Sequence, residues 1–191
     1  MIYRFFVPVL LPILLAACSS APSGPKTDPL YQASAVSVTM PGFVTMPGTT
    51  LRWYSDIQWT DDPQGQYKRR AQVLQQALQR EFEHKGYHFV DDPGAATYDV
   101  VAIALRGKLQ DREELESVFR LYPSLAEPAK GYGQGTVLVA IAPAGTRDIV
   151  WRGALAVFTD PGGKLPVAER DQRMSWAASK ILGSIPSIPS K

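Results

Sequence analysis

The chain has 191 residues, with 20 lysines and arginines against 18 aspartates and glutamates, so its formal net charge is +2. The two signs are interspersed, which argues against a basic nucleic-acid-binding stripe and against an acidic tail. A single cysteine cannot form an intrachain disulfide, so the fold must be held by its apolar core, and the chain is long enough to bury one.

Residues 1–17 have the organisation of a signal peptide. Arg4 supplies a short positive region, the apolar run Phe5–Leu15 follows, and the small residues Ala16 and Ala17 stand at the expected cleavage point. The apolar run is shorter than the roughly 20 residues of a membrane-spanning helix and is interrupted by prolines. We therefore expect residues 1–17 to be cleaved from the mature chain.

The only cysteine, Cys18, directly follows this leader. The sequence LAAC at residues 15–18 resembles the bacterial lipobox, in which a leucine and two small residues precede an invariant cysteine. The resemblance implies a diacylglyceryl thioether on Cys18, a reaction that needs a thiol because sulfur is the best side-chain nucleophile for it. The alternative is a chance cysteine buried as a small hydrophobe. We expect Cys18 to be the lipidation site, with membrane lipid as its partner.

The residues after Cys18 predict where the anchor is sorted. In bacteria with two membranes, an aspartate directly after the lipidated cysteine resembles an inner-membrane retention signal. Here Ser19 stands at that position, and the first acidic residue is Asp28. This predicts an outer-membrane lipoprotein whose domain faces the periplasm. Residues 18–33 are rich in serine, proline and alanine without apolar periodicity, which predicts a flexible tether.

A duplicated turn motif follows. The sequence TMPG occurs at residues 39–42 and again at 45–48, and each Pro-Gly pair favours a type II turn. Two such turns would bring Met40, Phe43 and Met46 close together. Inward packing of these side chains is the commoner arrangement, and the alternative is an adaptable hydrophobic lip for a partner or a lipid.

The next segment alternates apolar and polar residues. Leu51, Trp53, Ile57 and Trp59 fall on one face, which predicts a strand with one buried side. Tryptophans on such a face are typically core residues, although a glycan-binding platform is the alternative.

From about Pro63 to Lys85 the period changes to that of an amphipathic helix. One apolar stripe is formed by Tyr67, Ala71, Leu74, Leu78 and Phe82. Asp62 is suited to the start of this helix, and Gly86 to its C-terminal cap.

The rest of the chain alternates strands with shorter helices. Strands are expected at residues 87–90, 98–105, 136–142 and 149–158, and helices around 115–122 and 167–182. We therefore predict a single α+β domain over residues 34–183, an antiparallel sheet of about five to six strands with two to three helices packed on it. Trp151 is expected in its core, and residues 184–191 are expected to form a frayed, proline-containing tail.

No catalytic, cofactor or metal site is predicted. His84 and His88 have a spacing that could bind zinc, but Gly86 between them should end the helix and separate the rings. The adjacent Glu113 and Glu114 read as solvated charges, and residues 131–135 precede a strand rather than the helix of a phosphate loop. No Gly-x-Ser-x-Gly elbow is present.

Several short motifs resemble a family of bacterial lipoproteins catalogued as domain of unknown function 4136. The residues are LQREFEHKGY at 78–87, YDVV at 98–101, GTV at 135–137, VWRG at 150–153 and KIL at 180–182. Two departures are Ala142-Pro143, where the family commonly has an aspartate, and a longer segment at 108–130. The resemblance implies an exported, lipid-anchored α+β domain with no assigned activity, so no catalytic residue carries over.

Two functions follow as hypotheses. The first is a non-catalytic binding or assembly module of the periplasm, held by its lipid, with an envelope protein as a partner. The alternative is a hydrolase of envelope glycans or peptides with a cleft around Trp59, Asp61 and Asp62.

Overall fold

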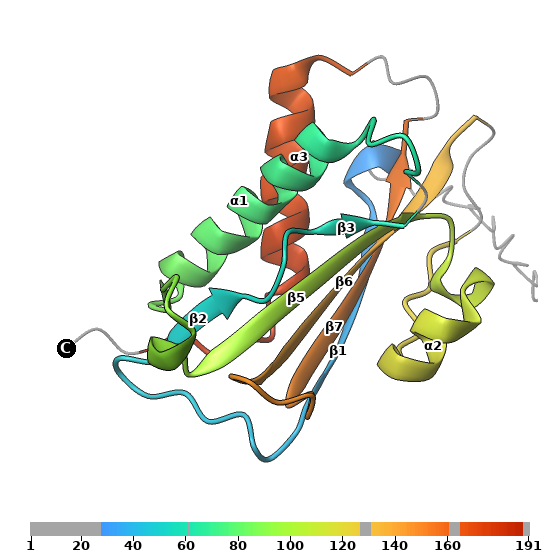
Figure 1. The fold of residues 1–191 in the computed structure, drawn as a ribbon. Helices are drawn as coiled ribbons and strands as arrows, with labels where there is room; N and C mark the ends of the chain where they lie inside the picture. The colour runs from blue at the N-terminus through green and yellow to red at the C-terminus, as the bar shows by residue number, and fades with distance from the viewer. Residues whose placement is uncertain (1–27, 61, 127–130, 161–164, 189–191) are drawn as a thin grey trace, which may run out of the picture.

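The structure, a computed structural model, describes residues 28–60, 62–126, 131–160 and 165–188. Cys18, Ser19 and Asp61 lie outside the described residues, as do the leader and the first part of the expected tether. The described residues form one α+β domain, in which three α-helices pack on a seven-stranded sheet (Figure 1).

The sheet is mixed rather than antiparallel. Its order is β1-β7-β6-β5-β2-β4, with β3 also paired to β5. The strands are β1 (Ala33–Thr39), β2 (Thr50–Trp53), β3 (Gln58–Trp59), β4 (His88–Phe89), β5 (Tyr98–Arg106), β6 (Gly133–Pro143) and β7 (Trp151–Thr159). The four strands β1, β7, β6 and β5 pair antiparallel, as predicted for the sheet, although no strand was expected at residues 33–39. At the other edge, β2 and β3 run parallel to β5, and β4 runs parallel to β2.

The prediction of a purely antiparallel sheet is therefore wrong at this edge, and the number of strands exceeds the five or six expected. The physical reason is the helix that connects β2 and β3 to β4. A helical crossover returns the chain to the same end of the sheet, so the strand that follows it runs parallel to the one before.

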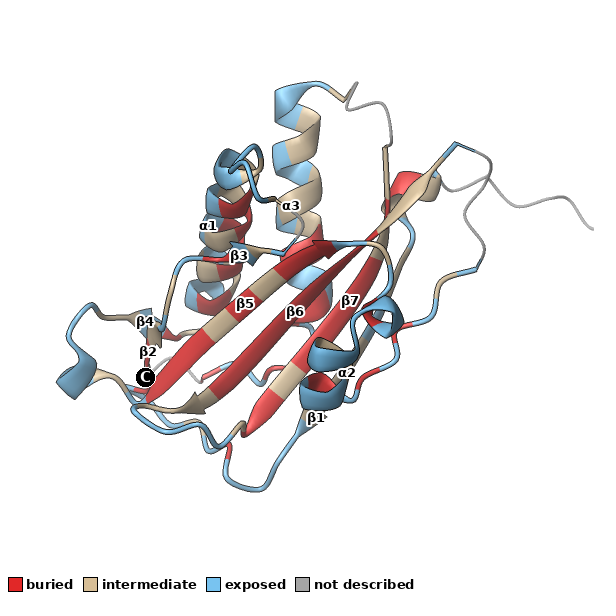
Figure 2. Ribbon diagram, turned by 45° about the vertical axis from the view of Figure 1, so that its right-hand side comes forward, coloured by how far each residue is buried: buried red, intermediate tan, exposed pale blue. Residues whose placement is uncertain are grey.

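The three helices lie on both faces of the sheet. Helices α1 (Lys68–His84) and α3 (Val167–Ile181) cover one face, and the short α2 (Glu113–Phe119) lies on the other (Figures 1 and 2). Helix α1 begins five residues later than Pro63, because the Asp62 carboxylate accepts the N–H groups of Gln66 and Tyr67, at 2.6 Å each, and holds the preceding segment in turns. Among the described residues, no helix is long and apolar enough to cross a bilayer.

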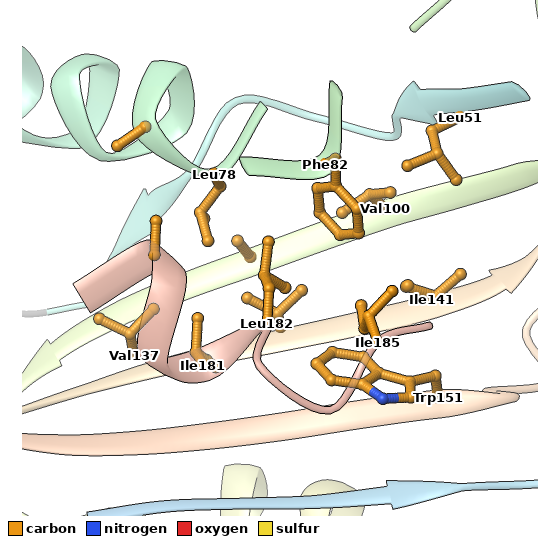
Figure 3. Close-up of a cluster of buried hydrophobic side chains, with 14 of the residues drawn as sticks. Leu51, Leu78, Phe82, Val100, Val137, Ile141, Trp151, Ile181, Leu182 and Ile185 are labelled. Carbon is orange, nitrogen blue, oxygen red and sulfur yellow. The ribbon is translucent and has the colours of Figure 1, made fainter. Parts of the chain in front are cut away.

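Most of the core lies between the sheet and the pair α1 and α3. Figure 3 shows its side chains, contributed by β2, α1, β5, β6, β7, the end of α3 and the segment after it: Leu51, Leu78, Phe82, Val100, Val137, Ile141, Trp151, Ile181, Leu182 and Ile185. Trp151 is fully buried, as predicted. A smaller cluster on the second face joins Phe119 of α2 to Leu105 and Leu138 of the sheet. The sheet is therefore buried on both sides over much of β5, β6 and β7 (Figure 2).

The predicted strand over residues 51–59 is two strands. Bends at residues 54–56 separate β2 from β3, so the two tryptophans belong to different strands. Leu51 and Ile57 are buried, whereas Trp53 and Trp59 are half-buried and pack against the edge of the core. Trp53 stacks on Phe89 of β4 with ring centroids 5.4 Å apart.

Both ends of the described chain are packed, contrary to the predicted boundaries. Residues 28–33, predicted as tether, form a 3-10 turn (Pro29–Tyr31) and the start of β1, and Leu30 of that turn is buried. In the tail predicted to fray, Ile185 and Ile188 are buried.

The tail packs because its backbone groups find hydrogen-bond partners at the end of α1 and in the loop after it. The hydroxyl of Tyr87 donates to the Pro186 carbonyl at 2.9 Å, and the N–H of Ile188 donates to the Lys85 carbonyl at 2.7 Å. Gly86 between them has φ of 90° and lies so close that a Cβ would be 3.0 Å from the Ile188 carbonyl oxygen. This approach explains the Lys-Gly-Tyr sequence at the end of α1.

Candidate functional site

A cleft of about 330 Å³ opens between α1 and α3, at the end of the sheet where β5 and β7 finish and β6 begins. The first half of α1 forms one wall and α3 forms the other. These helices pack against each other further along, and Figure 1 shows them side by side over the same face of the sheet. The cleft thus lies above the sheet, between two helices that come from opposite halves of the chain.

The floor of the cleft is apolar and small. Ala104, Val137 and Val157 come from the sheet face that carries the main core, and Gly135 adds no side chain. Leu74 and Met174 continue this apolar lining up the helical walls. The backbone N–H and C=O groups of the floor are paired within the sheet, so the floor presents methyl and methylene groups to a ligand.

Aromatic rings border the cleft on both sides. The rings of Trp59 and Tyr67 lie 5.1 Å apart at the α1 wall. Trp176 of the α3 wall meets Tyr31, in the turn before β1, edge to face at 5.6 Å. Trp59 Nε1 is buried without a hydrogen-bond partner in the described structure.

Four arginines line the cleft, and they come from α1, β5 and α3. The guanidinium of Arg70 lies 5.0 Å from the centroid of the Tyr67 ring, a cation–π contact. Arg106 Nη1 donates to the Tyr67 hydroxyl at 3.2 Å. Arg170 contributes to the α3 wall. Asp160 is the one acidic residue among the described residues of this lining, so the cleft carries an excess of positive charge.

Arg173 has a structural role. Its Nη2 donates to the carbonyl oxygens of Leu30 and Phe158, at 2.9 and 2.8 Å, and so ties the start of the domain to the end of β7. Burial lowers the pKa of the Arg173 guanidinium from its ordinary value, while the nearby Tyr31 and Asp28 oppose this. An arginine remains charged at neutral pH even so, and it adds to the positive character of the cleft.

The structure separates the residues that the sequence singled out. Trp59 lines the cleft, but both carboxylate oxygens of Asp62 accept backbone N–H groups before α1, and Asp61 lies outside the described residues. His84 and His88 are exposed, one at the end of α1 and the other in β4. In the part of the chain that the structure describes, no three His, Cys, Asp or Glu residues come together as a metal site.

The two Pro-Gly turns form, but their methionines point outward. Phe43 N–H donates to the Met40 carbonyl and Thr49 N–H to the Met46 carbonyl, which closes both turns. Gly48 has the positive φ of a type II turn, and Gly42 does not. Phe43 packs against Tyr98 at 5.4 Å, whereas Met40 and Met46 are 44% and 62% exposed. Inward packing is therefore correct for Phe43 and wrong for both methionines.

No family model matches the chain, and no curated protein matches it significantly. Its fold is similar to solved structures of the PelC dodecamer from Paraburkholderia phytofirmans. Two crystal forms, one with a point substitution, each give a TM-score of 0.48 at 7% identity, covering 83% of this chain and 100% of that chain.

A DUF4136 family protein from Bacteroides thetaiotaomicron is also similar, with a TM-score of 0.47 at 13% identity, over 82% of this chain and 98% of that chain. This family name, domain of unknown function 4136, agrees with the resemblance seen in the sequence motifs. At 7% and 13% sequence identity, the similarity to these structures concerns the fold alone.

Proposed function

We propose that this protein is an envelope lipoprotein whose α+β domain acts as a non-catalytic binding module. The observation that carries the proposal is the position of the only cysteine, directly after an apolar leader and two alanines. Acylation of Cys18 would hold the domain at a membrane, because two or more acyl chains make release from a bilayer slow. Ser19 in place of an aspartate supports sorting to the outer membrane, with the domain in the periplasm.

The cleft between α1 and α3 is the proposed binding site. The first packed residues of the domain lie beside it, since the Leu30 carbonyl accepts from Arg173 and Tyr31 contacts Trp176, and both partners line the cleft. Eleven residues, 19 to 29, separate Leu30 from Cys18, so the distance between the two cannot exceed about 43 Å. The anchor therefore keeps the cleft within a few nanometres of the lipid surface, where its partner would be an envelope component.

Metabolic labelling with radioactive palmitate tests the anchor. The wild-type chain should take up label and sediment with outer-membrane markers in a sucrose gradient. Cys18→Ser should take up none, whereas Ser20→Ala, two residues away, should label as wild type does. Label retained in Cys18→Ser would refute the lipid anchor, and wild type sedimenting with inner-membrane markers would refute the outer-membrane assignment.

A further inference from the structure

We propose that the cleft between α1 and α3 binds an anionic amphiphile, a lipid with one apolar chain and one anionic head group. This inference rests on the proposed role of the cleft as a binding site and adds the chemical class of the ligand. We propose that this ligand is a lipid of the surrounding envelope.

The floor selects the apolar part of the ligand. Ala104, Val137 and Val157 offer only methyl groups, and Met174 offers a flexible thioether that adapts to the shape of a chain. A volume of about 330 Å³ lies at the lower end of the range for small-molecule sites, which suits a single chain better than two. A sugar lying on Ala104, Val137 and Val157 would set hydroxyl groups against side chains that offer no hydrogen-bond partner, which is unfavourable.

The arginines select the head group. Arg70 lies on α1 and Arg170 on α3, so the two opposite walls each bring a half-buried guanidinium to the cleft, and Arg106 joins them from the end of β5. Guanidinium groups bind phosphate and carboxylate through paired, charge-assisted hydrogen bonds. With Asp160 as the one acid of the described lining, the site attracts an anion and repels a cation.

The aromatic rings place the head group next to the chain. Tyr67 holds Arg70 over its ring and accepts a hydrogen bond from Arg106, so two of the arginines are fixed against one side chain at the α1 wall. Trp59, whose ring packs against that of Tyr67 at a tilt of 33°, brings its indole to the same wall. Indole and phenol rings, apolar in body and polar at the edge, are well suited to the junction between an acyl chain and its head group.

The test uses the chain from residue 18 to residue 191 with Cys18→Ser, which contains every described residue and carries no lipid of its own. Dodecyl phosphate and dodecyltrimethylammonium are titrated below their micelle-forming concentrations, and inorganic phosphate is titrated in parallel. Binding is followed by calorimetry and by the intrinsic tryptophan fluorescence, to which Trp59 and Trp176 of the cleft contribute. We expect dodecyl phosphate to bind at least tenfold more tightly than either of the other two.

Matched variants locate the site. Arg70→Gln and Arg170→Gln should each weaken dodecyl phosphate binding about tenfold, the effect of losing one hydrogen bond to a charged group. Arg80→Gln, an exposed position of α1 outside the cleft, should leave it unchanged. Val157→Phe should weaken binding by filling the floor, and its melting curve reports whether the variant folds.

Three outcomes would overturn the proposal. Equal affinity for the anionic and cationic chains would show a non-specific apolar surface, and equal affinity for dodecyl phosphate and inorganic phosphate would show an anion site without a chain-binding floor. Unchanged binding in both Arg70→Gln and Arg170→Gln would place the ligand elsewhere. The titrated chain lacks Cys18, so ligand binding is measured independently of acylation. The palmitate experiment can therefore refute the lipid anchor without refuting the ligand of the cleft, and the titration can refute the ligand without refuting the anchor.

Discussion

The indole ring of Trp151 lies across Gly153, two residues further along the same face of β7. A Cβ placed on Gly153 would be 2.5 Å from Trp151 Cη2 and 3.1 Å from Cζ2, which is closer than side chains pack. Ile181 of α3 covers the same glycine from above, with Cγ1 at 3.3 Å. The Trp-Arg-Gly sequence is thus explained by packing, because the glycine leaves the space that the fully buried tryptophan fills.

Gly153→Ala should therefore destabilise the domain by about 1–3 kcal/mol through overpacking. The measurement is urea unfolding followed by circular dichroism. Gly94→Ala is the matched control, because a Cβ there meets only ordinary contacts with Asp92. A Gly153→Ala variant as stable as this control would contradict the close packing of the indole.

Trp151→Ala should cost about 3–5 kcal/mol, the usual loss for a large buried aromatic side chain. In this background the added Gly153→Ala substitution should cost much less than it does in the wild type, because the ring it clashes with is gone. Unfolding free energies of the four chains give the coupling directly. A loss below about 1 kcal/mol for Trp151→Ala would contradict its place in the core.

Asp99 of β5 links β2 to the turn after β6 and should be sensitive to substitution. Its Oδ1 lies 2.7 Å from Arg52 Nη2 of β2, and its Oδ2 accepts the N–H of Gly145 in the turn after β6 at 3.0 Å. Asp99→Ala should destabilise by about 3–5 kcal/mol, since it strands a partly buried arginine and an unpaired amide. Asp148→Ala, exposed in the same turn, is the control. If Asp99→Ala lowers the free energy of unfolding by less than about 1 kcal/mol, water hydrates the Arg52 guanidinium and the Gly145 N–H as well as the carboxylate does, and the prediction is wrong.

Tyr87 should make stability depend on pH in the alkaline range. Burial raises the pKa of its hydroxyl from 10.0 to about 12 in the folded chain. Its contribution is therefore complete below pH 10 and is lost as the pH rises from 10 to about 12, because the unfolded chain releases the proton first. Unfolding midpoints of wild type and Tyr87→Phe at pH 9 and pH 11 measure the effect. The wild type should lose more stability over this interval than the variant, and parallel losses would contradict the shift.

Local periodicity was sufficient to predict the regular elements but not their arrangement. The stripe that ends at Phe82 predicted α1, and the apolar runs after Tyr98 and Gly135 predicted the central strands β5 and β6. The parallel pairing of β2, β3 and β4 was missed. The sequence did indicate it, because a helix between two strands is typical of a parallel crossover. The tail was missed because Ile185 and Ile188, among prolines, show no period, and only the loop after α1 reveals their partners.

The cleft could not be predicted because no local segment encodes it. Arg70, Arg106 and Arg170 are spread over a hundred residues and meet only when α1 and α3 lie on the same sheet face. Each arginine alone looks like a solvated surface charge. Trp59 was singled out for its place near Asp61 and Asp62, whereas in the structure its ring packs against Tyr67, the residue directly before α1.

The pairing of β1 with β7 sets the order in which the domain can be completed. Val36 is the partner of Ala154, so the first strand of the sheet pairs with the last one. A contact between residues so far apart in sequence slows folding, because the conformational entropy of the long intervening loop is lost before the contact can stabilise the chain. A chain that emerges N-terminus first therefore holds an uncharged, proline-free strand without a neighbour until β7 has followed, and such strands readily pair with other chains. The pairing of β1 is complete only when residue 157 has been made, and a chain that stops before β7 leaves both β1 and β6 without this neighbour.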